Sequence, residues 1–197
     1  MSLQNLTLES LFVSKVRIKA LKFFMLNPSR EIHLRGAVRA FEEEINAVRR
    51  EFSRLEKVQL ITSDTKGNRL YFKLNLSHPF INELMSFFHK SYGLGGEIIE
   101  MQEKLGDVAF ALLTPAFTRG MYFGDQIIDL FVVGKINLKE LQKIIHHHED
   151  EIGREINYTV IDENEFKLRK RRGDQFINNI MIQDNVLLIG RHEDLIR

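Results

Sequence analysis

The chain of 197 residues contains no cysteine, which excludes disulfide bonds, thiolate metal sites and a cysteine nucleophile. It has no apolar run approaching the roughly 20 residues of a membrane-spanning helix, and its N-terminus lacks the hydrophobic core of a signal peptide. It also lacks a phosphate-binding glycine loop, a nucleophile–base pair and a paired-carboxylate acid/base site. These absences predict a cytoplasmic protein with no membrane partner, no resident cofactor and no metal site.

The chain as a whole has no large excess of charge, because its formal net charge is only +1. The halves nevertheless differ: residues 1–92 contain 15 Lys/Arg and 9 Asp/Glu, a net of +6, and residues 93–197 contain 13 and 18, a net of −5. An imbalance of this size is common in ordinary soluble domains. It also indicates two domains, of which the first would favour a polyanionic partner.

The boundary between the halves is predicted by three glycines within four residues, Gly93–Gly96. They follow an amphipathic segment, residues 79–92, in which a proline suits the start of a helix. The apolar face of that helix is expected to consist of Phe80, Leu84, Phe87 and Phe88. We therefore expect an N-terminal domain of residues 1–92 and a C-terminal domain of residues 93–197.

The N-terminal half is expected to contain three helices and a hairpin. Apolar spacing predicts helices over Leu11–Leu26, Leu34–Phe41 and Ile45–Lys57, the first ending before a proline. Two β-rich runs then flank Thr65–Asn68, a hairpin signal with a basic tip. Three helices and a hairpin within about 65 residues predict a winged helix-turn-helix, in which one helix and the hairpin meet DNA.

Residues 45–57 are expected to read double-stranded DNA, because one stripe of the helix is apolar and the opposite face is basic or hydrogen-bonding. Asn46 and Arg50 are predicted to contact base edges, since Asn suits adenine and Arg suits guanine. Phosphate contacts are predicted for the remaining cations of this surface: Arg49, Arg54, Lys57, Lys66, Arg69 and Arg35. The preceding Glu42–Glu44 suit the helix dipole but would repel a phosphate at the same helix end.

The C-terminal half changes to continuous apolar runs, which are typical of strands buried on both faces. Strands are predicted over residues 108–113, 127–133, 156–161 and 186–189. Helices are predicted over residues 98–105, 164–172 and 174–182, and Asn137 with Glu140 forms a capping box for another that reaches about Ile152. Alternating strands and helices predict a small α/β domain with a mixed sheet.

A family resemblance covers nearly the whole chain. Residues 10–92 resemble the winged-helix domain of a family that joins such a domain to a nucleotidyltransferase-like one. The matching segments are LFVSKVRIKALKFF, EIHLRGAVRAF, VRREFSRLEKVQLI, GNRLYFKLN and HPF…SYGLGG. Residues 97–190, including INYTV, are similar to the family's second domain. The resemblance implies a two-domain α+β or α/β fold: a winged helix-turn-helix followed by a small nucleotidyltransferase-like domain.

The family's catalytic signature is incomplete in this chain. An active member has Gly-Ser before an x-x-Arg-Gly turn, then Ser-Asp-x-Asp, whose two carboxylates hold Mg²⁺ against the nucleotide phosphates. Aligning the chain through Arg119-Gly120 places Pro115-Ala116 at Gly-Ser, and proline has no N–H to offer a phosphate. Of the carboxylates, Asp129 survives and its partner becomes Ile127. We therefore expect an inactive domain in which Asp129 is structural or vestigial.

Two other clusters are ambiguous. His146–His148 are adjacent on a predicted helix, where about 100° separates neighbours, so we expect a solvated face and not a three-histidine metal site. His146 with Asp150 could still contribute two ligands. The stretch Lys167–Arg172 is strongly basic and either contacts nucleic acid or pairs with the acids before it. Those acids are Asp162, Glu163 and Glu165.

The predicted function is a sequence-specific DNA-binding transcriptional regulator. Its second domain would serve ligand sensing, dimerisation or partner binding, which implies a homodimer and a small-molecule or protein effector as possible partners. One alternative is an active, metal-dependent nucleotidyltransferase that modifies a protein or small molecule through Asp125 and Asp129. Another is a winged-helix scaffold for protein–protein interaction.

Overall fold

The computed structural model describes residues 10–121 and 128–193. These residues form helices α2–α11 and two β-sheets, a mixed α and β structure. The chain divides into two compact units, residues 1–91 and 92–197, one residue away from the boundary that the glycines predict. None of the helices in the described ranges combines the length and the apolar character needed to cross a lipid bilayer.

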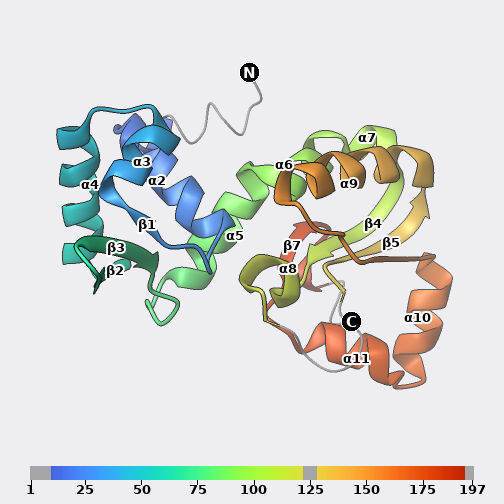
Figure 1. Cartoon of the computed structure of the whole chain (residues 1–197). Coiled ribbons are helices and arrows are strands. Elements are labelled where there is room, and N and C mark those ends of the chain that lie inside the picture. The colour runs from blue at the N-terminus through green and yellow to red at the C-terminus, as the bar shows by residue number, and fades with distance from the viewer. Residues whose placement is uncertain (1–9, 122–127, 194–197) are drawn as a thin grey trace. The chain divides into compact units, whose positions relative to one another are not determined.

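The first unit combines helices with a small antiparallel sheet of strand order β1-β3-β2 (Figure 1). The second and third predicted helices and the hairpin lie where the apolar spacing predicts them, whereas the first helix begins at Lys15 and not at Leu11. In chain order the elements are α2 (Lys15–Leu26), β1 (Ile32–His33), α3 (Leu34–Phe41), α4 (Ile45–Lys57), β2 (Ile61–Lys66), β3 (Arg69–Leu74) and α5 (Ile81–Ser91). Strand β1 was not predicted, because its two residues are too few to show a period.

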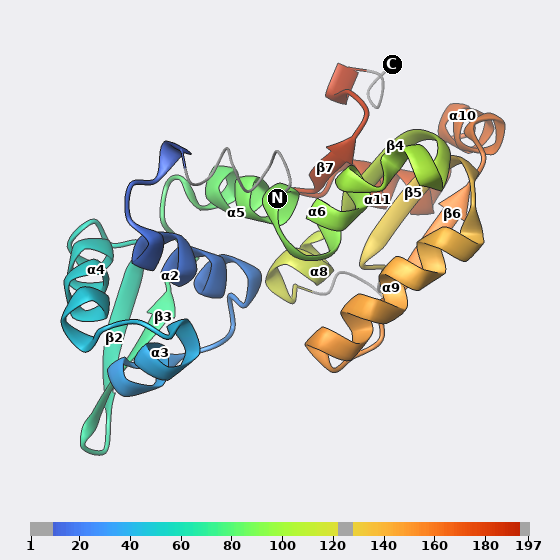
Figure 2. The same cartoon turned by 90° about the horizontal axis from the view of Figure 1, so that it is seen from above.

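The hairpin has a two-residue turn. Lys66 pairs with Arg69 across the strands, which leaves Gly67 and Asn68 as the connection. Gly67 has a φ of 61°, a conformation that glycine adopts without the strain a side chain would bring. Figure 2 shows the hairpin extending past α3 and α4, so its basic tip is presented away from the core of the unit.

Phe52 is the centre of the core in the first unit. Its ring lies 4.8 Å from that of Phe72 on β3, 5.6 Å from Phe24 on α2 and 6.2 Å from Phe41 on α3. Aromatic pairs at such distances add stabilisation to the area they bury. One side chain of α4 therefore joins the sheet and two helices, which fixes the opposite face of α4 toward solvent.

A buried carboxylate lies on the same inner side of α4. Glu51 is 5% exposed and accepts a hydrogen bond of 2.8 Å from Arg17 Nε on α2 and one of 2.7 Å from Arg54 Nη1. Burial raises the pKa of Glu51, but the hydrogen bond and charge of Arg17, together with Arg54, outweigh it. They hold the pKa below its ordinary value of 4.5. The burial of Glu51 could not be predicted from the sequence, because a glutamate on an amphipathic helix is usually exposed.

We expect Glu51→Gln to lower the free energy of unfolding near neutral pH by about 1.5–3 kcal/mol, since the lost hydrogen bonds join charged groups. The folded pKa lies below the unfolded one. The stabilisation is therefore complete above about pH 4.5 and is lost as the pH falls through the folded pKa. Urea unfolding of both proteins across this range measures the difference.

The control is Glu43→Gln, whose partly exposed pair with Lys19 should contribute under about 1 kcal/mol. A Glu51→Gln difference that is the same at every pH would contradict this role.

The predicted apolar face of the last helix in this unit was partly wrong. Phe80 is 65% exposed and precedes α5, where its N–H donates to His78 Nδ1 over 3.2 Å. Phe88 is buried as predicted, and the helix also buries Ile81 and Met85, which were not predicted. The turn before the helix thus removes Phe80 from the helical spacing on which the prediction depended.

The second unit is built on a four-stranded sheet of order β6-β5-β4-β7. Strands β5 and β6 are parallel and the other neighbours are antiparallel, so the predicted mixed sheet is confirmed. Its elements are α6 (Gly93–Glu100), α7 (Gln102–Leu105), β4 (Gly106–Leu113), α8 (Pro115–Arg119), β5 (Leu130–Ile136), α9 (Leu138–Ile152), β6 (Tyr158–Ile161), α10 (Glu163–Arg171), α11 (Gln175–Met181) and β7 (Val186–Ile189).

Both faces of this sheet are buried, as the continuous apolar runs predict. Ala111 and Leu113 of β4 pack with α6, α7 and α9, whereas Phe110 and Leu112 pack with α10 and α11. Figure 1 shows these helices on opposite sides of the sheet. The unit is therefore a three-layer arrangement of helix, sheet and helix.

Several bounds in the second unit differ from the predictions. The helix predicted over residues 98–105 begins already at Gly93 and divides into α6 and α7, and Gly95 and Gly96 are buried within α6, where the absence of side chains allows close packing. Strand β5 begins at Leu130 and not at 127, and residue 127 lies outside the described residues. Asp129 precedes the strand, and its N–H donates to Asn157 O over 2.7 Å.

Candidate functional site

The exposed face of α4 is a polar stripe. Asn46, Arg50, Ser53 and Lys57 are all exposed and lie within an arc of about 60° at 100° per residue. The Arg50 guanidinium and the Lys57 ammonium make no hydrogen bond or ion pair with any described residue. These two cations are therefore available to an anionic partner without breaking an existing contact.

The other predicted contact residues are also exposed, but several have partners within the chain. Arg49 Nη1 donates to Asn46 Oδ1 over 3.2 Å, and Arg54 is held by Glu51. Lys66 at the hairpin forms an ion pair with Glu31 and lies 5.9 Å from the centre of the Tyr71 ring. Arg35 on α3 and Arg69 on β3 are exposed with no such partner in the described part of the chain.

One of the three acids at the start of α4 is neutralised. Glu43 accepts from Lys19 Nζ of α2 over 2.7 Å, and the same ammonium donates to Phe41 O over 2.7 Å. Glu42 adopts the left-handed conformation that ends α3, with a φ of 53°. Glu44 precedes α4 without a side-chain capping bond. Lys19 thus reduces the repulsion that these acids would exert on a phosphate.

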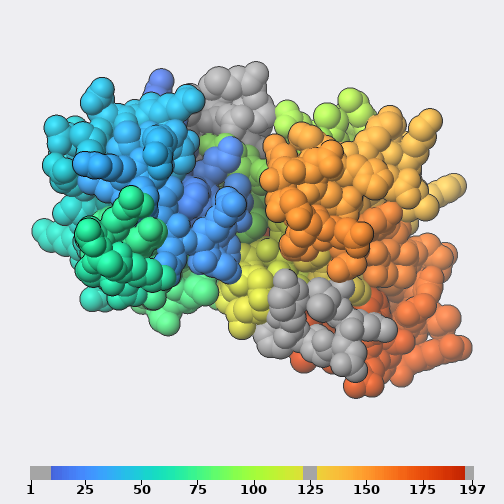
Figure 3. All heavy atoms as spheres, in the orientation of Figure 1, coloured from blue at the N-terminus to red at the C-terminus, as the bar shows by residue number. Residues whose placement is uncertain are grey.

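Helix α4 and the hairpin contribute to one surface of the first unit. In Figure 3 the α3–α4 segment (blue to cyan) adjoins the hairpin (green). Contacts between α4 and β2 hold the two elements together. The polar stripe of α4 and the basic hairpin tip are therefore positioned by the same small core.

Asp129 is a buried carboxylate that forms an ion pair with the partly exposed Arg154 in the second unit. The residue is 0% exposed, and its two oxygens accept from Arg154 Nη1 and Nη2 over 2.8 and 2.9 Å. The N–H of Asn157 adds a bond of 3.0 Å. Arg154 also lies 5.5 Å from the centre of the Phe117 ring. Both carboxylate oxygens thus hold the α9–β6 connection in place beside β5.

The remaining parts of the nucleotidyltransferase signature offer few phosphate ligands. Pro115 is at the first turn of α8, where its missing N–H leaves one donor fewer at the helix start. Ile127, which aligns with the second carboxylate of the signature, and Asp125, the alternative second carboxylate, lie outside the described residues.

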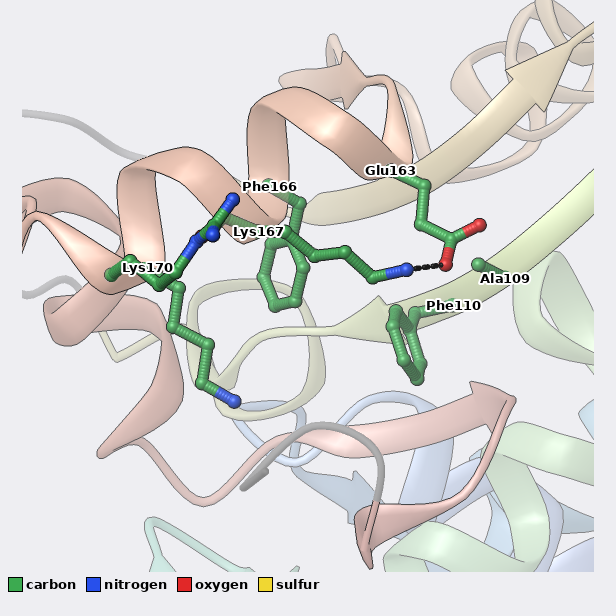
Figure 4. A pocket seen from close by; sticks show the side chains of 7 residues that line it. Ala109, Phe110, Glu163, Phe166, Lys167 and Lys170 are labelled. Carbon is green, nitrogen blue, oxygen red and sulfur yellow. Dashed lines mark hydrogen bonds and ion pairs between the residues drawn. The ribbon is translucent and has the colours of Figure 1, made fainter.

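A hollow of about 830 Å³ lies beside α10 in the second unit (Figure 4). Phe110 and Phe166 line it together with the cationic Lys167, Lys170 and Arg171. Lys167 forms an ion pair with Glu163, and Lys170 Nζ lies 6.0 Å from the centre of the Phe166 ring. Apolar rings beside cations suit an anionic ligand with a flat apolar part.

The basic stretch in α10 is partly paired with the acids before it. Lys167 pairs with Glu163 and Arg169 with Glu165, each one helical turn away. Asp162 instead caps the helix by accepting from two backbone N–H groups. Of the two interpretations, pairing with neighbouring acids thus accounts for Lys167 and Arg169.

The prediction of a solvated histidine face was wrong for His148. This side chain is 6% exposed and bonds through Nε2 to Glu97 Oε2 of α6 over 2.8 Å. His147 Nδ1 lies 3.1 Å from the same oxygen, and the Glu97 carboxylate, by hydrogen bond and charge, raises the pKa of His147 above its ordinary value. His146 is exposed and bonds to Glu149. Packing of α9 on α6, which the sequence does not show, brings two adjacent histidines to one acid.

Comparisons of the chain with protein-family models, with curated proteins and with solved structures found no match. No activity can therefore be transferred from a relative, and the functional conclusion depends on the chemistry of the residues described above.

Proposed function

We propose that this chain is a sequence-specific DNA-binding transcriptional regulator. In this proposal residues 1–92 form a winged helix-turn-helix with α4 as its recognition helix. The observation that carries it is the exposed stripe of Asn46, Arg50, Ser53 and Lys57 on a helix whose other face is fixed by the core, beside a hairpin with a basic tip.

The dimensions of α4 support this role. Its 13 residues span about 20 Å at 1.5 Å per residue, and a helix fits the major groove, which is about 12 Å wide. Recognition helices contact bases mainly through their N-terminal residues. Asn46 and Arg50 lie in the first two turns and would read bases, while Lys57 at the far end would hold a phosphate.

The hairpin and the flanking cations would add contacts to the DNA backbone. Lys66 and Arg69 lie at the hairpin tip, Arg49 and Arg54 lie on α4 on either side of its polar stripe, and Arg35 lies on α3. Lys66 and Arg54 would exchange a carboxylate partner for a phosphate, whereas Arg35 and Arg69 need no exchange among the described residues. Phosphate contacts of this kind fix register without reading sequence.

For residues 93–197 the proposal is a nucleotidyltransferase-like domain that has lost its reaction and serves ligand sensing, dimerisation or partner binding. The engagement of Asp129 by Arg154 supports this, because both oxygens that would hold Mg²⁺ already accept hydrogen bonds. The hollow beside α10 favours ligand sensing among the three roles. An active nucleotidyltransferase would instead give heat and a transfer product with Mg²⁺ and a nucleoside triphosphate.

The decisive experiment is selection of bound fragments from a genomic DNA library, followed by affinity measurements over a range of salt concentrations. We expect one enriched sequence, with two-fold symmetry if the chain acts as a homodimer. With six candidate phosphate contacts per chain, we expect the logarithm of the association constant for DNA to fall with the logarithm of the salt concentration, with a slope of about −5 per chain. Absence of both enrichment and salt-dependent binding would favour a protein–protein scaffold instead.

A further inference from the structure

A cluster outside the proposed DNA surface brings three metal-ligating side chains together. Glu97 comes from α6, and His147 and His148 come from α9, fifty residues later in the chain. One possible ligand atom from each residue lies within 4.8 Å of the other two. Helix packing in the second unit, and not a local sequence motif, creates the cluster.

Two of the three distances between ligand atoms in the cluster are close to those of a tetrahedral metal site. Glu97 Oε2 is 3.1 Å from His147 Nδ1 and 2.8 Å from His148 Nε2. Zinc bonds of about 2.1 Å place neighbouring tetrahedral ligands about 3.4 Å apart. An ion could therefore replace the shared hydrogen bonds through shifts of a few tenths of an ångström along these two edges.

Glu151 orients the ligands from the other side. Its Oε2 is 3.1 Å from His148 Nδ1, the ring nitrogen that faces away from Glu97, and its Oε1 is 4.0 Å from His147 Nε2. A carboxylate that accepts from Nδ1–H leaves Nε2 of the same ring with its lone pair free for a metal ion. This carboxylate–histidine–metal arrangement is typical of protein metal sites.

We propose that Glu97, His147 and His148 bind a divalent transition-metal ion of the Zn²⁺ class, with Glu151 as the positioning residue. Two imidazoles and one carboxylate suit Zn²⁺ and its neighbours better than Mg²⁺ or Ca²⁺, which prefer oxygen ligands. Three protein ligands leave a fourth position for water or an exogenous group. Because the ligands come from two helices, the bound ion joins α6 to α9.

The site is tested by titrating the chelator-treated full chain with Zn²⁺ in a calorimeter, and with Co²⁺ while recording the visible spectrum. We expect one Zn²⁺ per chain and the intense visible bands of tetrahedral Co²⁺, with no binding of Mg²⁺. His147→Ala should weaken Zn²⁺ binding by more than about 100-fold. Glu151→Ala should weaken it by about 10–100-fold, the usual effect of losing an outer partner.

The matched control is His146→Ala. His146 is adjacent, exposed and bonded to Glu149 outside the cluster, so this variant should bind Zn²⁺ as the wild type does. His147 is also largely exposed, so both variants should keep the fold, which circular dichroism checks. Failure of the wild-type chain to bind Zn²⁺, or equal affinities of His147→Ala and His146→Ala, would overturn the proposal.

Discussion

Arg50→Ala is expected to weaken binding to the selected DNA sequence by about 1–3 kcal/mol and to relax the preference at one base pair. The reason is that the Arg50 guanidinium is exposed in the second turn of α4 and has no partner among the described residues, so it can form a bidentate contact with guanine. Affinities for the selected duplex, for its single-base variants and for a random duplex measure the change. The loss should be largest on the selected duplex and small on the random one.

Lys57→Ala is the matched control for this prediction. Lys57 lies on the same face of α4, is also exposed and has no partner in the described residues. Its removal should weaken all duplexes alike and make the salt slope shallower by about one unit. Neither change should alter stability by more than about 0.5 kcal/mol, since both side chains are on the surface. Equal losses from Arg50→Ala on selected and random duplexes would refute a base-reading role.

Arg154→Met is expected to give the largest loss of stability, about 3–5 kcal/mol in the free energy of unfolding of the second unit. The loss arises because Asp129 is 0% exposed and would lose the guanidinium that now donates to both of its oxygens. A domain is usually stable by only about 5–15 kcal/mol, so the variant should unfold at a much lower urea concentration. Urea unfolding followed by circular dichroism measures the loss.

Two further variants show whether the uncompensated charge is the cause. Lys143→Met removes an exposed cation paired with Glu140 on the same unit, and should cost under about 1 kcal/mol. The double variant Asp129→Asn with Arg154→Met removes the buried charge along with its partner, and should recover part of the loss. A loss from Arg154→Met no larger than that from Lys143→Met would show that the ion pair contributes little.

The elements with strong periodicity could be predicted from the sequence. Helix α4 and strand β7 have the predicted bounds, and α9 begins at its predicted cap, where Asn137 accepts from the N–H of Glu140. In each case the information is local: apolar spacing, a capping residue or a turn. The exposed positions of the predicted DNA contacts follow in the same way from the face of a helix or the tip of a hairpin.

Features that depend on tertiary contacts could not be predicted. Glu51 meets Arg17 across 34 residues, and Asp129 meets Arg154 across 25. The separation of about 100° between adjacent side chains keeps the histidines of an isolated helix apart, whereas Glu97 approaches α9 from another helix and reaches two adjacent rings. Local spacing indicates which face a residue occupies, but not which distant side chain packs against it.

Both faces of the central sheet in the second unit are buried, and this restricts which sequence changes its strands can accept during evolution. Neighbouring residues of β4 belong to different layers, so Phe110 faces α10 while Ala111 faces α6 and α9. Losing or gaining one residue within the strand would exchange these faces and drive a large ring into the space of a methyl group. Insertions and deletions should therefore be confined to the connections between strands, while the strands themselves vary only by substitution.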